Sequence, residues 1–211
     1  EAYERALELG PSDPTVLDGF AWYLLSMGGR TEEAFDLSER LLRVAPLDLY
    51  WRSERVGHVY FAGQYERALE EVERVRLLDP SFQHDQVTWI YADLGRFEEA
   101  YRASIAFFER GGAPFDWMRE ALERGWAEGG WEGSMRAWLE VATRIEGFSP
   151  RNVALGYTLI GETDEAFAWL ERGYRERDPL MVELRAHPGF DPLRPDPRFD
   201  DLLRRIGFPE Q

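Results

Sequence analysis

Small residues recur along this chain at a fixed distance from each other and with a nearly constant period. In "LGRFEEAY" (94–101), Gly95 is followed five positions later by Ala100. The same spacing is found at Gly29, Gly63, Gly95, Gly129 and Gly161, each followed by Ala34, Ala68, Ala100, Ser134 and Ala166 respectively. Both series step by 34, 32, 34 and 32 residues. A period near 33 residues predicts a helical repeat array.

Each unit has the pattern of two helices joined by a glycine turn. The i, i+3, i+4, i+7 spacing that marks one buried face of a first helix is found at Val87, Ile90, Tyr91 and Leu94. Gly95 ends that helix, because glycine takes the left-handed conformation at no steric cost. Ala100 marks the place where the backbone of a second helix comes close to its neighbour. No segment alternates apolar and polar residues over five or more positions, so we expect an all-α fold.

Helix starts are marked by a capping side chain followed by proline. Such pairs are Asp13-Pro14, Ser149-Pro150, Asp178-Pro179 and Asp196-Pro197. The polar side chain can accept hydrogen bonds from the first turn, and proline suits the first helical position. The pair formed by His84 and Asp85 predicts another helix start.

The repeat resembles the tetratricopeptide repeat. The segments "GQYERAL" (63–69) and "GRFEEAY" (95–101) match it closely, "GETDEAF" (161–167) carries threonine in place of the aromatic, and "GGWEGSM" (129–135) matches weakly, with its register open by one residue. The resemblance covers residues 1–177 and implies a right-handed α-solenoid of helix-turn-helix units. An orphan helix at 1–10 would precede five pairs at about 14–46, 48–80, 82–112, 114–147 and 149–177.

The C-terminal segment, 178–211, has a different character. Its high proline content predicts two short helices, near 179–186 and 197–206, that cap the last unit of the array. The sequence "HPGFDPLRPDPRFDDLLRRIGFP" (187–209) resembles the end of repeat regions that follow cyclase, kinase or winged-helix domains in bacterial signalling proteins. The resemblance implies that the chain is the C-terminal part of a larger cytoplasmic signalling or regulatory protein.

Composition argues against several classes of function. Acidic residues outnumber basic ones by 40 to 25, so the chain would repel nucleic acid. It lacks cysteine and lysine, which removes thiol nucleophiles, thiolate metal sites and Schiff bases. No apolar run reaches the roughly 18 residues of a membrane span. The three histidines have no metal-ligand spacing. We therefore expect no enzyme activity, no cofactor, no metal and no membrane partner.

The resemblance also implies a concave groove lined by first helices. Trp22 and Trp89 would take the same groove position in their units, with Trp126 one turn further along. The candidate groove residues are Trp22, Asp18, His58, Asp85, Trp89, Arg119, Trp126 and Arg151. An aromatic groove with arginine at one end suits an extended peptide with an acidic part. The alternative is that these tryptophans only fill wide gaps between helices.

These observations favour a non-catalytic protein- or peptide-binding scaffold. Two alternatives stay open. One is self-association of the chain as a homodimer, and the other is a small-molecule sensor that uses the aromatic groove.

Overall fold

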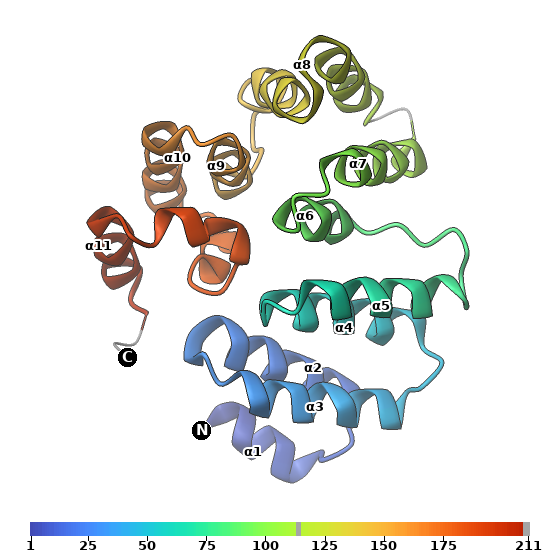
Figure 1. Cartoon of the computed structure of the whole chain (residues 1–211). Helices are drawn as coiled ribbons and strands as arrows, with labels where there is room; N and C mark the ends of the chain where they lie inside the picture. Colours follow the sequence, from blue (N-terminus) through green and yellow to red (C-terminus); the bar gives the residue numbers. More distant parts are fainter. Residues whose placement is uncertain (113–114, 209–211) are drawn as a thin grey trace.

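The computed structural model describes residues 1–112 and 115–208, and over these ranges the chain contains helices and no β-strand (Figure 1). The prediction of an all-α fold is confirmed. The helices are α1 (Ala2–Leu9), α2 (Pro14–Tyr23), η1 (Leu24–Gly28), α3 (Thr31–Val44), α4 (Leu49–Phe61), α5 (Tyr65–Arg76), α6 (Asp85–Asp93), α7 (Phe97–Gly111), α8 (Asp116–Ala142), α9 (Pro150–Leu159), α10 (Thr163–Glu176), η3 (Pro179–Glu183), η4 (Pro188–Leu193) and α11 (Pro197–Ile206).

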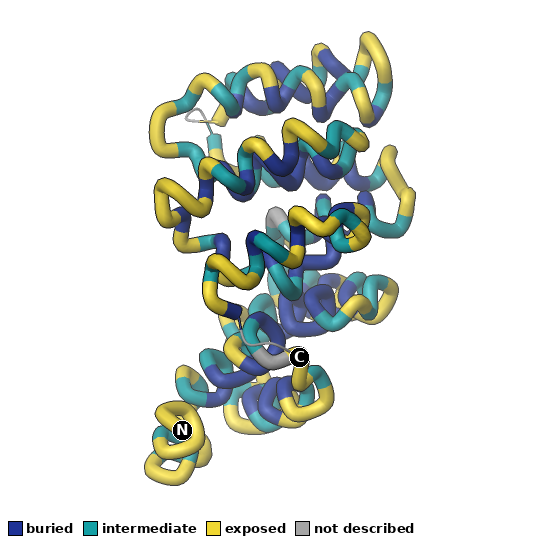
Figure 2. The backbone as a smooth tube through the Cα atoms, turned by 90° about the vertical axis from the view of Figure 1, so that its left-hand side faces the viewer, coloured by how far each residue is buried: buried dark blue, intermediate teal, exposed yellow. Residues whose placement is uncertain are grey.

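Consecutive helices pack in pairs, and each pair packs against the next. The pairs are α2 with α3, α4 with α5, α6 with α7, and α9 with α10, while α8 bends back on itself to form one more. The pairs follow one another around a curve (Figure 1). Buried residues lie toward the middle of the stack and exposed ones toward its outer turns (Figure 2). The right-handed solenoid and the tetratricopeptide assignment stay predictions.

Glycines with positive φ angles form the turns inside the pairs. The φ angles are 60°, 72°, 70° and 76° at Gly29, Gly63, Gly95 and Gly161. In the fourth unit the expected turn residue, Gly129, has a φ of −158°, and Gly130 is left-handed instead, with a φ of 61°. The turn thus lies one residue later than the glycine series predicts, because residues 129 and 130 are both glycine and either can take the left-handed conformation.

The small residue of each second helix is buried at a close contact. The exposed fraction is at most 1% for Ala34, Ala68, Ala100, Ser134 and Ala166. Within α8 the two halves approach even more closely, since a Cβ atom on Gly125 would lie 2.2 Å from the carbonyl oxygen of Gly133. Only glycine allows the backbones to come so near each other there.

The predicted caps are present. Side-chain oxygens accept hydrogen bonds from first-turn N–H groups at Asp13, Ser149, Asp178 and Asp196. His84 caps α6 in the same manner, accepting from the backbone N–H of Gln86.

The C-terminal segment from residue 178 to 208, here called the tail, differs in part from its prediction. The helix expected at 179–186 is a 3-10 turn, η3, that ends at Glu183, and a further 3-10 turn, η4, follows at Pro188–Leu193. Pro188 and Pro192 have no N–H to donate, which favours short turns over a continuous α-helix. The second predicted helix is present as α11, and Phe199 and Leu202 are buried on its apolar face.

The tail also reaches further than a cap on the last unit. It packs on α9 and α10 as expected, but η4 also contacts α6, and η3 contacts η1 near the start of the chain. The guanidinium Nη1 of Arg185 donates to the carbonyl oxygen of Met27 over 3.3 Å. The tail therefore lies across the inner side of the curve and joins its two ends (Figure 1).

Candidate functional site

The structure divides the predicted groove residues among separate places. Asp18, Trp22 and His58 meet between α2 and α4. Trp89 and Arg151 line one cavity further along the curve. The other three, on α6 and α8, are described after these two sites.

The first group forms a closed cluster, defined by Asp18, Trp22, Ser38, Glu54 and His58 and here called the Asp18–His58 cluster. The Nδ1 atom of His58 lies 2.9 Å from the hydroxyl of Ser38, and its Nε2 atom lies 3.4 Å from a carboxyl oxygen of Asp18. Burial lowers the pKa of His58 to about 3, helped by nearby positive charge. Burial and the charge of Glu54 raise the pKa of Asp18 to about 7. At neutral pH the imidazole is therefore uncharged.

A serine, a histidine and an aspartate in contact have the composition of a hydrolase triad. Here, however, Ser38 and His58 have an exposed fraction of 0%. A nucleophile must reach a substrate atom, and no substrate can approach a side chain with no exposed surface. In this structure the cluster joins α2, α3 and α4 through buried polar contacts.

Trp22 covers this cluster. Its indole N–H donates to a carboxyl oxygen of Glu54 over 2.9 Å, and its ring centroid lies 4.8 Å from that of His58 and 5.0 Å from that of Phe61. The ring also lies against Gly57, where a Cβ atom would come within 2.7 Å of it. Trp22 thus fills a gap between helices.

The second place is a cavity of about 310 Å³, here called the aromatic cavity. Its apolar wall includes Trp89, Phe107, Phe108, Phe115, Trp138 and Phe148. A narrower pocket of about 60 Å³, the inner pocket, shares four of these residues and is closed by Leu122 and Met135. The only hydroxyls lining the inner pocket, those of Thr88 and Ser104, lie 3.1 Å apart and bond to each other. An aromatic chamber with a deeper apolar recess is typical of a site that receives a large apolar group.

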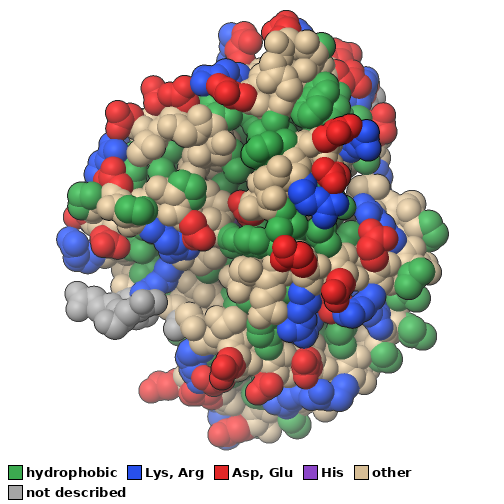
Figure 3. All heavy atoms as spheres, in the orientation of Figure 1, with side chains coloured by type: hydrophobic (Ala, Val, Ile, Leu, Met, Phe, Trp, Pro, Cys, Tyr) green, Lys and Arg blue, Asp and Glu red, His purple; other side chains and the backbone are tan. Residues whose placement is uncertain are grey.

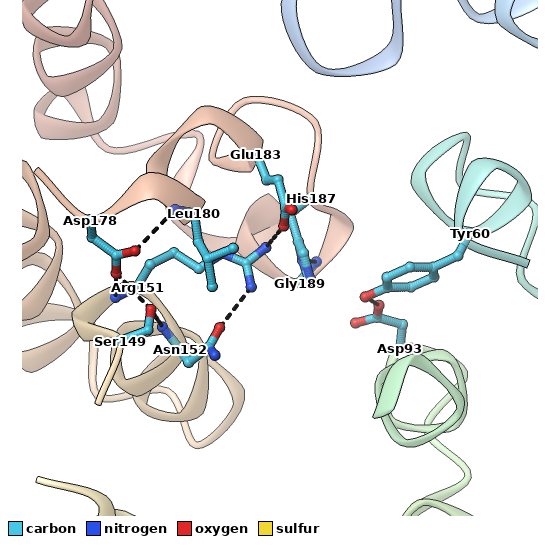
Figure 4. A network of polar contacts seen from close by, with 10 residues as sticks. All are labelled: Tyr60, Asp93, Ser149, Arg151, Asn152, Asp178, Leu180, Glu183, His187 and Gly189. Atoms are coloured by element: carbon cyan, nitrogen blue, oxygen red, sulfur yellow. Dashed lines mark hydrogen bonds and ion pairs between the residues drawn. The ribbon is translucent and has the colours of Figure 1, made fainter. Parts of the chain in front are cut away.

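Polar side chains gather on one side of the aromatic cavity around Arg151, which is 4% exposed. Its Nη2 donates to Glu183 over 2.7 Å and its Nη1 to Asn152 over 3.0 Å (Figure 4). The backbone N–H of Arg151 donates to Asp178, which also accepts from the hydroxyl of Ser149. These bonds tie the start of α9 to η3 and fix the guanidinium in place.

The tail forms part of the cavity wall. Leu180, Glu183 and His187 line it from this segment. His187 is buried, and its ring centroid lies 5.5 Å from that of Tyr60 and 5.1 Å from that of Phe61, both on α4. Burial lowers the pKa of His187 well below its ordinary value, so it is neutral, and it accepts the backbone N–H of Gly189.

Tyr60, which packs against His187 of the tail, also contacts α6: its hydroxyl donates to Asp93 over 2.8 Å (Figure 4). Burial raises the pKa of Asp93 to about 6. The contact between the tail and α4 is therefore a packed aromatic junction with a polar edge.

Of the remaining predicted residues, Arg119 and Trp126 are not among those that line the aromatic cavity. Arg119 pairs with Glu123 over 2.8 Å along its own helix. Trp126 stacks on Tyr101, with ring centroids 4.3 Å apart and an interplanar angle of 11°. Asp85 is the first residue of α6, and its side chain lies outside the described part of the structure.

Sequence reasoning missed the contribution of the tail and of the second helices to the cavity. The available signal was the adjacent pair Phe107 and Phe108 near the end of α7. Neighbouring residues on a helix point in different directions, so both rings cannot belong to one buried face. Nothing in the sequence indicated that Glu183 and His187 would join them.

Within the described ranges, no group of three or more histidine, aspartate or glutamate side chains is arranged to hold a metal ion. Among the same residues, no helix combines the length and apolar character needed to cross a lipid bilayer. No family model and no curated protein matches this chain.

Proposed function

We propose that this chain is a non-catalytic binding module that captures a protein or peptide partner by an apolar side chain inserted into the aromatic cavity. The observation that carries the proposal is the cavity itself, about 310 Å³ in volume and walled by aromatic side chains. Binding energy at protein interfaces concentrates in a few large side chains that fill such pockets. A volume of this size suits one anchor group and leaves the rest of the partner on the outer surface.

The position of the tail limits how a partner approaches. Because the tail crosses the inner side of the curve, an extended peptide lying along the whole array would have to displace it. A single anchoring side chain would not. The positive charge of Arg151 is compensated by Glu183, so the preference for an acidic segment is not part of this proposal.

The surface supports a protein partner over nucleic acid. The net charge is −15, and on the face seen in Figure 3 positive and negative side chains are interspersed with hydrophobic ones. Mixed surfaces of this kind suit contacts with other proteins, whereas a phosphate backbone requires a concentrated positive patch. The wider role, a tetratricopeptide-like scaffold at the C-terminal end of a cytoplasmic bacterial signalling protein, rests on the sequence resemblance.

A screen of a random peptide library on the purified chain tests the proposal. Selected peptides should share one large apolar residue, and their affinity, measured by calorimetry, should fall at least ~10-fold in Trp89→Ala. Trp126→Ala is the matched control, because Trp126 stacks on Tyr101 away from the cavity. Peptides that bind both variants as well as the parent chain would reject the aromatic cavity as the site.

A small-molecule sensor is the second candidate, and the inner pocket favours it. That pocket of about 60 Å³ is almost entirely apolar in its lining and adjoins the larger chamber. A metabolite that competes with the selected peptides would favour this function.

Self-association is the third candidate. Leu9, Leu47 and Leu77, at the ends of α1, α3 and α5, have exposed fractions of 74%, 74% and 84%. Exposed aliphatic side chains of this kind can form a dimer contact. Light scattering over a concentration series decides the matter, since a constant monomer mass rejects self-association.

A further inference from the structure

The wall of the aromatic cavity comes from helices α4, α6, α7, α8 and α9 and from the tail, which also packs on α4 and α6. We propose that the cavity takes a neutral aromatic group and that its occupancy holds the tail against α4 and α6. This inference rests on the proposed function and specifies both the ligand chemistry of that site and its effect on the fold.

The neutrality of the ligand follows from the charges around the cavity. Arg151 and Glu183 form an ion pair at 2.7 Å, and Asn152 accepts a further bond from the guanidinium. His187 carries no charge in its buried position. A charged ligand would have to lose its hydration, and the charged side chains of the described lining, Arg151 and Glu183, already pair with each other, which makes its burial costly. An anion would in addition meet the field of a chain with net charge −15.

The aromatic character follows from the walls. Trp89, Phe108 and Trp138 border both the chamber and the inner pocket. Aromatic pairs gain stability from offset or edge-to-face contacts beyond the area they bury. A ring in the chamber would contact these walls, and a small substituent such as a methyl group would fit the inner pocket.

The coupling to the tail follows from which segments contribute the wall. Trp89 stands on α6 and Trp138 on α8, whereas Leu180 and Glu183 belong to the tail. A ligand that contacts both surfaces binds the docked state more tightly than a state in which the tail has moved away. By linkage, the same ligand must then shift the equilibrium toward the docked tail.

Several contacts join the docked tail to the start of the chain. They include the bond from Arg185 to the carbonyl of Met27 and the packing of His187 on Tyr60 and Phe61. Arg185 does not line the aromatic cavity, so its substitution weakens docking without altering the ligand site directly.

Three probes with the same ring test the ligand class on the whole 211-residue chain. They are p-cresol, which is neutral, tyramine, which is a cation, and 4-hydroxyphenylacetate, which is an anion. Saturation-transfer NMR and calorimetry should give p-cresol an affinity at least ~10-fold higher than either charged probe. The Trp89→Leu variant should lose p-cresol binding, and Trp126→Leu should keep it. A charged probe that binds as tightly as p-cresol overturns the assigned ligand class.

Hydrogen exchange of residues 179–208 tests the coupling. Saturating p-cresol should slow exchange in the tail by at least ~5-fold. Arg185→Ala should speed tail exchange in the free protein, and saturating p-cresol should slow it again in this variant, because both act on one docking equilibrium. The control is Arg204→Ala, since the exposed side chain of Arg204 pairs with Asp201 on its own helix, and no other ion pair of Arg204 is found within the described residues. Tail exchange that stays unchanged on p-cresol binding, in the parent chain and in Arg185→Ala, overturns the coupling.

The outcomes separate this inference from the proposed function. If the selected peptides bind through Trp89 while none of the three probes binds, the ligand class is wrong and the binding module stands. If p-cresol binds as expected while the peptide screen yields nothing that depends on Trp89, the inference stands and the protein-binding function falls.

Discussion

The inner side of the first two helix pairs is filled, whereas that of the later pairs is hollow. Trp22 and Trp89 were predicted to take the same groove position on their first helices, but their neighbours differ. One edge of the Trp22 indole lies against Gly57, and the ring covers His58. Trp89 borders open space, with the hydroxyls of Thr88 and Ser104 behind it. A position on the inner side of the curve therefore does not by itself make a binding site. The residues on the next helix decide whether the indole is packed between helices or lines a cavity.

The largest expected effect comes from removing each indole. Trp22→Ala should lower the free energy of unfolding by up to about 3–5 kcal/mol, because the half-buried indole packs on His58, Phe61 and Gly57. Trp89→Ala should cost less than half as much, because its ring already borders a cavity. Urea unfolding followed by circular dichroism measures both. Equal losses would show that the two indoles are packed alike and would remove the contrast between the regions.

The pH dependence of stability tests the buried pair of the filled region. In Asp18→Asn, His58 remains, with a folded pKa of about 3 against an ordinary 6.5. The unfolded chain then binds the extra proton, so stability should fall as the pH drops below 6.5. The slope should be at most roughly 1.4 kcal/mol per pH unit.

The reverse substitution should reverse the slope. In His58→Gln, Asp18 remains, with a folded pKa of about 7 against an ordinary 3.8. The folded chain then binds the extra proton, so stability should be greatest below pH ~4 and should be lost as the pH rises toward 7. Urea titrations at pH 4.5, 5.5 and 6.5 compare the two variants. Parallel slopes would mean that the two groups do not titrate independently.

A third test concerns Gly57, whose missing side chain leaves room for the edge of the Trp22 indole. Gly57→Ala should cost about 1–3 kcal/mol, because the new Cβ would come within 2.7 Å of the indole. The control is Gly129→Ala, where nothing lies within 4 Å of a new Cβ, so any loss there reports the backbone conformation, with φ −158° and ψ 26°, and not crowding. A neutral Gly57→Ala would show that the indole moves aside freely.

The smallest effect is expected outside both regions. Arg119→Ala removes solvent-accessible ion pairs with Asp116 and Glu123, and exposed pairs contribute at most about 1 kcal/mol. Because Arg119 does not line the aromatic cavity, the affinity for p-cresol or for selected peptides should stay unchanged. A marked loss of affinity would extend the binding surface onto α8.

The helices could be predicted because their signals are local. Caps such as Asp13 and Ser149 and the spacing from Gly95 to Ala100 act within a few residues. The turn in α8 was displaced by one residue because Gly129 and Gly130 are chemically identical. The 3-10 geometry of the tail depends on prolines whose effect on turn type varies with packing.

The site could be predicted only in part, since it is made by contacts between distant segments. First-helix register pointed to Trp89 and Arg151, and both line the aromatic cavity. It also pointed to His58, which is enclosed by Ser38 and Asp18. The residues of the tail in the wall could not be inferred, because no local pattern tells where a segment docks 158 positions away, as Arg185 does on Met27.

The bond from Arg185 to Met27 also affects how the protein unfolds. In an open stack, an end unit has a neighbour on one side only, so stepwise fraying from the termini is the easiest route of unfolding. Here the tail rests on η1 and α4, so the helix pairs lie between two contacts, and α1, which has no buried residue, remains outside them. The helix pairs should therefore melt as one cooperative unit, and a break at the junction should turn a single transition into several.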